Sequence, residues 1–417
     1  MRQSPPYPPA FLRLAWSNLA AQSAEQVALA AAALVAVLAF GAGAGGTGLL
    51  LAAQTLPFLF LSIPAGLLAD RMPSRSRLLA AAEALRAGSL VVILVLAGFG
   101  WLSLPLLALL GFIGATGTVV YSVATPTLVP SLVQPGTLMA ANGRIELART
   151  TAFTAGPALG GALVGWLGSS PAFGAAAGLS VLAVILLSGV REPPRPPRLR
   201  RHAVTELREG AGFVFGHPLL RAVFATQVVF TLALFVLQTA YIPYAVHHLG
   251  LDAFGVGLTL AAHGAGLIVG ALMAARIVAL LPFGMVIGIG PVMGFAGSLL
   301  MALTLVLPWP WLAGLAFFVM GAGPIVWVVS TTTLRQTVTP PRLLGRVSAL
   351  NILGYSARPV GAALAAAVGA AYGLEACLIL AAAGFGAQAA VVLCSPLVRL
   401  RALPALAAEE PARAALP

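Results

Sequence analysis

The chain contains no lysine, and only 8% of its 417 residues carry a charged side chain. Soluble globular proteins have about 25% charged residues, so this scarcity excludes an ordinary water-soluble fold. Only two cysteines occur, Cys377 and Cys394, and on one continuous helix their spacing separates them by about 25 Å. They therefore cannot form a disulfide bond with each other.

The sequence also lacks the short motifs of the common enzyme classes. It has no glycine-rich phosphate loop, no cluster of His, Asp and Glu with the spacing of metal ligands, and no nucleophile motif around a serine or cysteine. We therefore expect that the protein is neither an enzyme nor an ATP-driven pump, and that it binds no cofactor and no metal. The formal net charge is +12, but the basic residues are not interleaved with aromatic ones, which argues against a nucleic-acid partner.

Apolar residues, in contrast, make up 60% of the chain, and the mean hydropathy is +0.99. Runs of about 20 apolar residues, long enough to cross a bilayer as helices, recur between short breaks rich in Gly, Pro or Arg. We predict an all-α integral membrane protein with twelve transmembrane helices. Their approximate spans are 14–40, 47–69, 78–99, 104–124, 138–166, 171–190, 219–243, 254–276, 284–306, 310–333, 348–371 and 374–398.

All 23 basic residues are arginines, and outside the predicted helices they lie only in alternate connections and in the two tails. This asymmetry follows the positive-inside rule. We therefore expect both termini and the arginine-rich connections in the cytoplasm, where the arginines also attract the head groups of anionic membrane lipids.

One long polar segment, residues 191–221, divides the predicted helices into two sets of six. We predict an N-terminal six-helix bundle over 1–190, a cytoplasmic linker with a short amphipathic helix over 191–218, and a C-terminal six-helix bundle with a short cytoplasmic tail over 219–417. Two six-helix halves with a substrate route between them are typical of secondary transporters.

A cluster of charges in "GLLADRMPSRSRLL" lies between the second and third predicted helices. The residues Gly66, Asp70, Arg71 and Arg75 resemble the loop 2–3 motif of the major facilitator superfamily, although Pro and Ser stand where that motif has Gly and Arg. The resemblance implies that the Asp pairs with Arg and caps a helix of the other half, which holds one side of a transporter shut. The alternative is that these arginines only anchor the topology.

A second motif lies in the fifth predicted helix, in "GRIELARTTAFTAGPALGG". It resembles the antiporter motif of the exporting branches of the superfamily, with one departure at Ala152. A Gly-Pro pair inside a helix bends it, and small residues allow close packing; a plain small-residue packing face is the alternative. The matching residues are Gly143, Gly156, Pro157, Gly160 and Gly161.

Longer stretches, among them "ELREGAGFVFGHPLLR" and "LLGRVSALNILGYSARPVGAAL", are similar to the bacterial exporter subfamily of enterobactin-type siderophore exporters and macrolide efflux pumps. The resemblance covers essentially the whole chain. It implies the major facilitator fold, a small-molecule substrate, the bacterial plasma (inner) membrane and a monomer. The arginine that drug antiporters often carry in the fourth helix is missing, so the resemblance supplies no proton route through that motif.

Charged side chains at membrane depth are costly and mark functional candidates. Glu25 lies near the middle of the first predicted helix, about 16 Å from its start. It is a candidate for carrying a proton or contacting a substrate cation, with a structural carboxyl as the alternative. Glu83 and Arg86 are spaced i, i+3 and can form a closed ion pair, which is more often structural.

Two further arginines are candidates for the substrate route. Arg149 has Glu146 at i−3 and lies nearer the cytoplasmic end of the fifth helix. Arg358 lies beside Pro359 in the eleventh predicted helix, and its charge predicts either a buried carboxylate partner, with Glu25 the obvious candidate, or an anionic group on the substrate.

These features predict a secondary active transporter that works by alternating access. The leading hypothesis is a proton-coupled exporter of an amphipathic small molecule of the drug or siderophore type, with the substrate, the proton gradient and membrane lipid as its partners. The alternative is a carrier of lysophospholipids or other solutes with the same fold, working as an importer or a uniporter.

Overall fold

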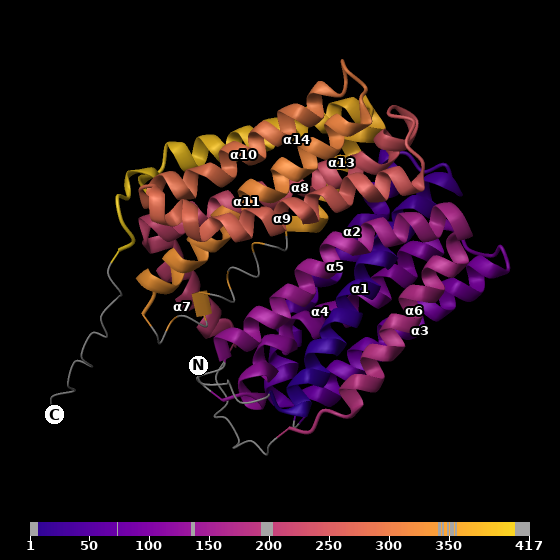
Figure 1. The fold of residues 1–417 in the computed structure, drawn as a ribbon, viewed down its shortest axis with the longest axis horizontal. Helices are drawn as coiled ribbons and strands as arrows, with labels where there is room; N and C mark the ends of the chain where they lie inside the picture. The colour runs from indigo at the N-terminus through magenta and orange to yellow at the C-terminus, as the bar shows by residue number, and fades with distance from the viewer. Residues whose placement is uncertain are drawn as a thin grey trace.

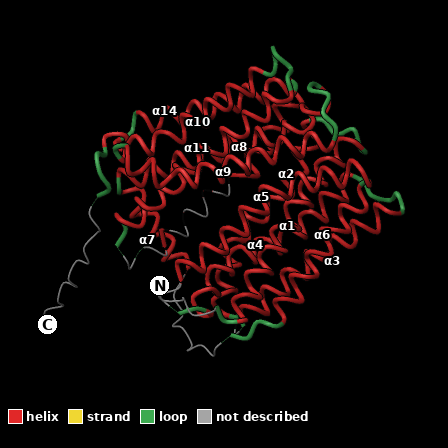
Figure 2. Tube along the Cα trace, in the orientation of Figure 1, coloured by secondary structure: helices red, strands yellow, loops and turns green. Residues whose placement is uncertain are grey.

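The computed structural model of the chain is a bundle of long helices (Figure 1). It describes residues 7–72, 74–134, 138–192, 203–340, 343, 346–347, 350, 354 and 357–404. Every regular element among these residues is helical (Figure 2). The predicted all-α architecture is confirmed.

Six helices form the N-terminal half. In this half α1 packs against α5 and α6, α3 packs against α4 and α6, and α2 packs against α4. The bounds are α1 Pro9–Leu38, α2 Ala44–Arg71, α3 Arg75–Gly98, α4 Leu104–Leu132, α5 Leu138–Leu167 and α6 Ser169–Ser188.

The C-terminal half has a similar set. Its α11 packs against α9 and α10, and α14 packs against α8 and α10, while α13 lies against α8. The bounds are α8 Pro218–His247, α9 Ala253–Leu280, α10 Phe283–Leu303, α11 Pro310–Val338, α13 Arg358–Tyr372 and α14 Leu374–Leu393, followed by the 3-10 turn η3 Pro396–Arg399.

Ten helices in the described part of the chain are long and apolar enough to cross a membrane. The two remaining members of the twelve-helix fold are α5, which begins with a polar segment, and α13, which has 15 described residues. Helix α1 starts at Pro9, earlier than the predicted residue 14, because proline is favourable in the first helical turn. Part of the predicted helix 348–371 precedes α13 and lies outside the described residues.

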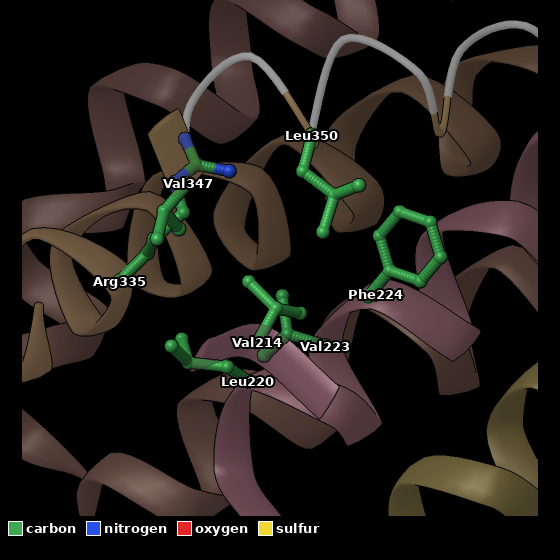
Figure 3. A pocket seen from close by; sticks show the side chains of 7 residues that line it. All are labelled: Val214, Leu220, Val223, Phe224, Arg335, Val347 and Leu350. Carbon is green, nitrogen blue, oxygen red and sulfur yellow. The ribbon is translucent and has the colours of Figure 1, made fainter. Parts of the chain in front are cut away.

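The connection between the halves includes the helix α7, Ala203–Gly216. Its Val214 belongs to an apolar cluster with Leu220 of α8 and with Val347 and Leu350. The side chains of this cluster surround a small pocket between α7 and the C-terminal half (Figure 3). The carboxylate of Glu209 also pairs with Arg346. Contacts of both kinds therefore hold α7 against the C-terminal half.

The two halves meet along two helix pairs, α2 with α13 and α5 with α9. Close contacts cluster at the end where α1 finishes and α2 and α9 begin, which we call the far end. There a Cβ atom at Gly161 would lie 3.0 Å from the Cα atom of Gly257, and one at Gly48 would lie 2.9 Å from the carbonyl oxygen of Ala362. In Figure 1 the halves diverge from the far end toward the opposite end, which carries α7 and which we call the linker end.

Candidate functional site

A buried cluster of three charges lies inside the N-terminal half. The Arg86 guanidinium of α3 pairs with the carboxylate of Glu83, one turn earlier on the same helix, as the i, i+3 spacing predicts. The same guanidinium lies 3.9 Å from a carboxylate oxygen of Glu25, which α1 contributes. The structure thus joins three of the predicted site residues in one cluster.

Arg86 also fixes the positions of the surrounding helices. It donates hydrogen bonds to the carbonyl oxygen of Ala21 at 2.6 Å, to the Ser180 hydroxyl at 3.2 Å and to the Thr118 hydroxyl at 3.4 Å. These partners belong to α1, α6 and α4, so a single side chain of α3 connects four of the six helices of its half. Such a network is favourable in a membrane interior because each of the three guanidinium nitrogens has a hydrogen-bond partner.

The cluster holds two carboxyl groups but only one guanidinium. The side chain of Glu83 is 0% exposed and that of Glu25 is 20% exposed. Among the described residues, one carboxyl oxygen of Glu83 is buried without a hydrogen-bond partner. A net negative charge buried in this way is unfavourable, so the cluster is chemically suited to hold a proton, and Glu25 is the member with access to it.

Arg358, for which the sequence predicts a buried carboxylate partner or an anionic substrate group, lies between the two halves. The ion pair of Glu25 is formed with Arg86, while the Arg358 guanidinium lies over two aromatic rings, 5.0 Å from the ring centre of Phe58 and 5.6 Å from that of Phe235. These rings belong to α2 and α8, hence to opposite halves. The charges of Arg358 and Arg149 still act electrostatically on Glu25.

Arg149 forms the predicted ion pair with Glu146, one turn earlier on α5. This pair is half exposed, with 46% of the Arg149 side chain and 55% of the Glu146 side chain accessible. The Arg149 guanidinium also lies 5.5 Å from the ring centre of Phe153. The exposure distinguishes this pair from the buried Glu83–Arg86 pair of the same spacing.

The loop 2–3 motif straddles the end of α2 and the start of α3 at the linker end. Gly66 packs near Val123 of α4, and the buried Arg75 donates a hydrogen bond to the carbonyl oxygen of Ala69 at 3.2 Å. Asp70 and Arg71 are the last two residues of α2, and their side chains lie outside the described residues.

Glu192 was missed at the sequence level because it lies in a polar segment that looks like a solvated linker. It accepts hydrogen bonds from the Ser76 backbone amide and, at 3.1 Å, from the Ser74 hydroxyl. Partial burial alone would raise the pKa of Glu192, but these hydrogen bonds outweigh burial and lower it. The carboxylate therefore stays ionised and ties the end of the α6 segment to the start of α3.

The glycines of the antiporter motif allow three close contacts of α5. A Cβ atom at Gly156 would collide with Gln26 of α1, and one at Gly160 would lie 2.9 Å from the Cβ atom of Ala30, which also belongs to α1. A Cβ atom at Gly161 would collide with the carbonyl oxygen of Ala253 at the start of α9. Pro157 lies inside α5 at this point, and Gly143 lies near the start of α5.

Two comparisons of the sequence with known proteins both indicate a transporter of the MFS type. A family model described as transmembrane secretion effector, MFS type, matches residues 7–415. The chain is also similar to an uncharacterized MFS-type transporter, y4rN, of Sinorhizobium fredii (strain NBRC 101917 / NGR234). The two sequences are 29% identical over 347 residues, which cover 77% of this chain and 79% of that protein.

Solved structures of transporters resemble the fold over nearly the whole chain. The nucleoside transporter NupG has a TM-score of 0.71 at 13% identity, and the match covers 92% of this chain and 98% of that one. A bacterial homologue of the human lysosomal transporter Spinster, in an inward-facing and occupied conformation, has a TM-score of 0.72 at 16% identity, over 97% and 100%. At such identities the likeness shows the fold alone.

Proposed function

The chain belongs to the transmembrane secretion effector family of MFS-type transporters, and on this premise we propose that it is a proton-coupled exporter of an amphipathic small molecule. Membership makes it a multi-pass membrane transporter and not an enzyme. The drug or siderophore type of substrate, the outward direction and the coupling ion are the parts that we propose. The observation that carries the proposal is the partly exposed Glu25 in a cluster with two carboxyls and one guanidinium.

Coupling follows from the chemistry of this cluster. A proton on Glu25 and a substrate cation beside Glu25 both neutralise the same carboxylate, so each disfavours binding of the other. If the carboxyl is exposed to one side of the membrane and then to the other, protons entering down their gradient displace substrate outward. Glu83 and Arg86 keep the carboxyl in place.

We propose that the linker end faces the cytoplasm of a bacterial inner membrane, with both termini inside and the protein working as a monomer. The arginine pattern of the connections supports this orientation. The close contacts at the far end then form an outer gate, and the helices of the two halves diverge from it toward the linker end (Figure 1).

The outer gate yields a prediction at Gly161. In a Gly161→Val variant the side chain cannot fit against Ala253 and Gly257, so α5 and α9 must separate at their outer ends. In a cysteine-free background, a cysteine introduced at the buried Thr239 should react at least about tenfold faster with an impermeant maleimide added from outside, since about 1.4 kcal/mol shifts an equilibrium tenfold.

Gly178→Val is the matched control, because a Cβ atom at Gly178 would meet nothing within 4 Å. The control should leave the labelling rate unchanged. Equal labelling of the Gly161→Val protein and the wild type would rule out an outer gate at this contact.

We also propose that the loop 2–3 motif latches the cytoplasmic side when the transporter faces outward. Asp70 would form the charge-assisted contact that must break for this side to open. Asp70→Asn should therefore increase the labelling of cysteines placed in the cytoplasmic part of the substrate route, measured with a maleimide added to inside-out vesicles. Unchanged labelling would remove the latch role from Asp70.

The function itself is tested by proton movement in proteoliposomes. Siderophores, macrolides, cationic dyes and lysophospholipids are added separately to protein reconstituted with an internal pH indicator. Proton movement opposite to the substrate, with one substrate class and not with protein-free liposomes, is the expected result. Substrate movement without any proton signal would make the protein a uniporter and contradict the proposal.

A further inference from the structure

The proposed proton coupling at Glu25 does not use the positive charge of Arg358. Arg358 lies at the start of α13, and its guanidinium lies near one ring from each half, Phe58 and Phe235. A cation at membrane depth is costly to keep, and proton antiport at Glu25 does not require it. Its position on the interface between the halves, within electrostatic reach of Glu25, suggests a role in substrate binding.

Close packing fixes this position. A Cβ atom at Gly361, one turn after Arg358, would lie 2.7 Å from the carbonyl oxygen of Leu232 and 3.0 Å from the Cβ atom of Phe235. Helices α13 and α8 therefore touch along their backbones next to Arg358. The two rings interact with the guanidinium through their faces, which orients a planar group whose N–H donors suit a carboxylate or a phosphate.

The sign of coupling constrains what the substrate carries. A purely anionic substrate bound at Arg358 would be attracted more strongly when Glu25 is protonated, so proton and substrate would bind together. Antiport requires the opposite. A substrate with a cationic group competes with the proton at Glu25, and its anionic group can at the same time use Arg358.

We propose that the transported molecule is an amphipathic zwitterion whose cationic group binds at Glu25 and whose anionic group binds at Arg358. Its apolar or aromatic body lies against Phe58 and Phe235. This inference rests on the proposed function and specifies the substrate class of the same site. It makes Arg358 the residue that distinguishes a zwitterion from a simple cation.

Two dyes that differ only at one carboxyl group test the proposal. Rhodamine 19 is a zwitterion with a free carboxylate, and rhodamine 6G is its ethyl ester, a simple cation. Binding to the full-length protein in lipid nanodiscs is measured by fluorescence anisotropy. The wild type should bind rhodamine 19 about tenfold more tightly than rhodamine 6G, the size of one charge-assisted contact.

Arg358→Gln should remove this preference, chiefly by weakening rhodamine 19, while Arg358→Lys should keep part of it because the charge remains. Arg276→Gln, on an exposed arginine near the end of α9, is the matched control and should keep the full preference. Retained binding of rhodamine 6G shows that a variant is folded.

Equal affinity of the wild type for the two dyes, or a preference that survives Arg358→Gln, would overturn the zwitterion assignment. The proposed function fails separately, since it depends on proton movement coupled to substrate and on Glu25. Rhodamine 6G that exchanges for protons without any preference for the free carboxylate would refute the inference and leave the exporter intact.

Discussion

Replacing Glu25 with glutamine should abolish export driven by a proton gradient while substrate binding stays measurable. Glutamine keeps the size and hydrogen-bonding capacity of the side chain but cannot exchange a proton. Substrate and proton then no longer compete at one carboxylate, and the coupling, typically about 5- to 150-fold in affinity, disappears. In proteoliposomes with an imposed pH gradient, accumulation of substrate should fall to the level that leak alone produces.

The pH dependence of binding gives a second readout of the same variant. In the wild type, lowering the pH adds a proton to Glu25 and so weakens the binding of a cationic group; the apparent affinity should fall as the pH falls. In Glu25→Gln the affinity should be lower but independent of pH over the same range. This readout separates loss of coupling from a general loss of binding.

Glu146→Gln is the control for this experiment, because Glu146 is also the carboxyl of an ion pair with an arginine but is more than half exposed. It should export at the wild-type rate. Full gradient-driven export by Glu25→Gln would assign Glu25 a structural role and remove the central residue of the proposed mechanism.

The fold was predictable from the sequence because a bilayer imposes strong constraints. Each spanning helix requires a long apolar run. Connections that carry arginine are expected on the cytoplasmic side of the membrane, which orders the helices in alternating directions. The boundaries were less predictable. Helix α1 extends to Pro9, beyond the apolar run, since a helix does not stop where the membrane does.

The candidate site was predictable only where it is local. The pairing of Glu83 with Arg86 follows from their spacing on one helix, whereas the contact of Arg86 with Glu25 depends on how α1 and α3 both pack against α6. Arg358 illustrates the same limit. Its neighbours Phe58 and Phe235 come from α2 and α8, and in a chain this apolar no periodicity indicates which faces of these helices turn toward each other.

Removing the Arg86 guanidinium should destabilise the protein more than any other single charge removal in the described part of the chain. In Arg86→Met, Glu83 and Glu25 lose their shared cation, and three hydrogen bonds to α1, α4 and α6 are lost. Breaking a buried ion pair from one side costs about 3–5 kcal/mol because a buried charge is left behind. Intrinsic tryptophan fluorescence during heating in detergent should show a clearly lower unfolding midpoint.

The origin of that loss can be resolved by a double-mutant cycle. Adding Glu83→Gln to Arg86→Met removes the orphaned carboxylate and should recover a large part of the stability, because the penalty comes from the buried charge.

Arg149→Met provides the matched control: its ion pair has the same i, i+3 spacing but is about half exposed, so its loss should cost only about 0–1 kcal/mol. Equal losses in Arg86→Met and Arg149→Met, or a double variant no more stable than Arg86→Met, would mean that the buried cluster does not organise this half. The expected inequality would instead show that Arg86 holds α1 in place, and with it the carboxyl that the proposed transport cycle protonates.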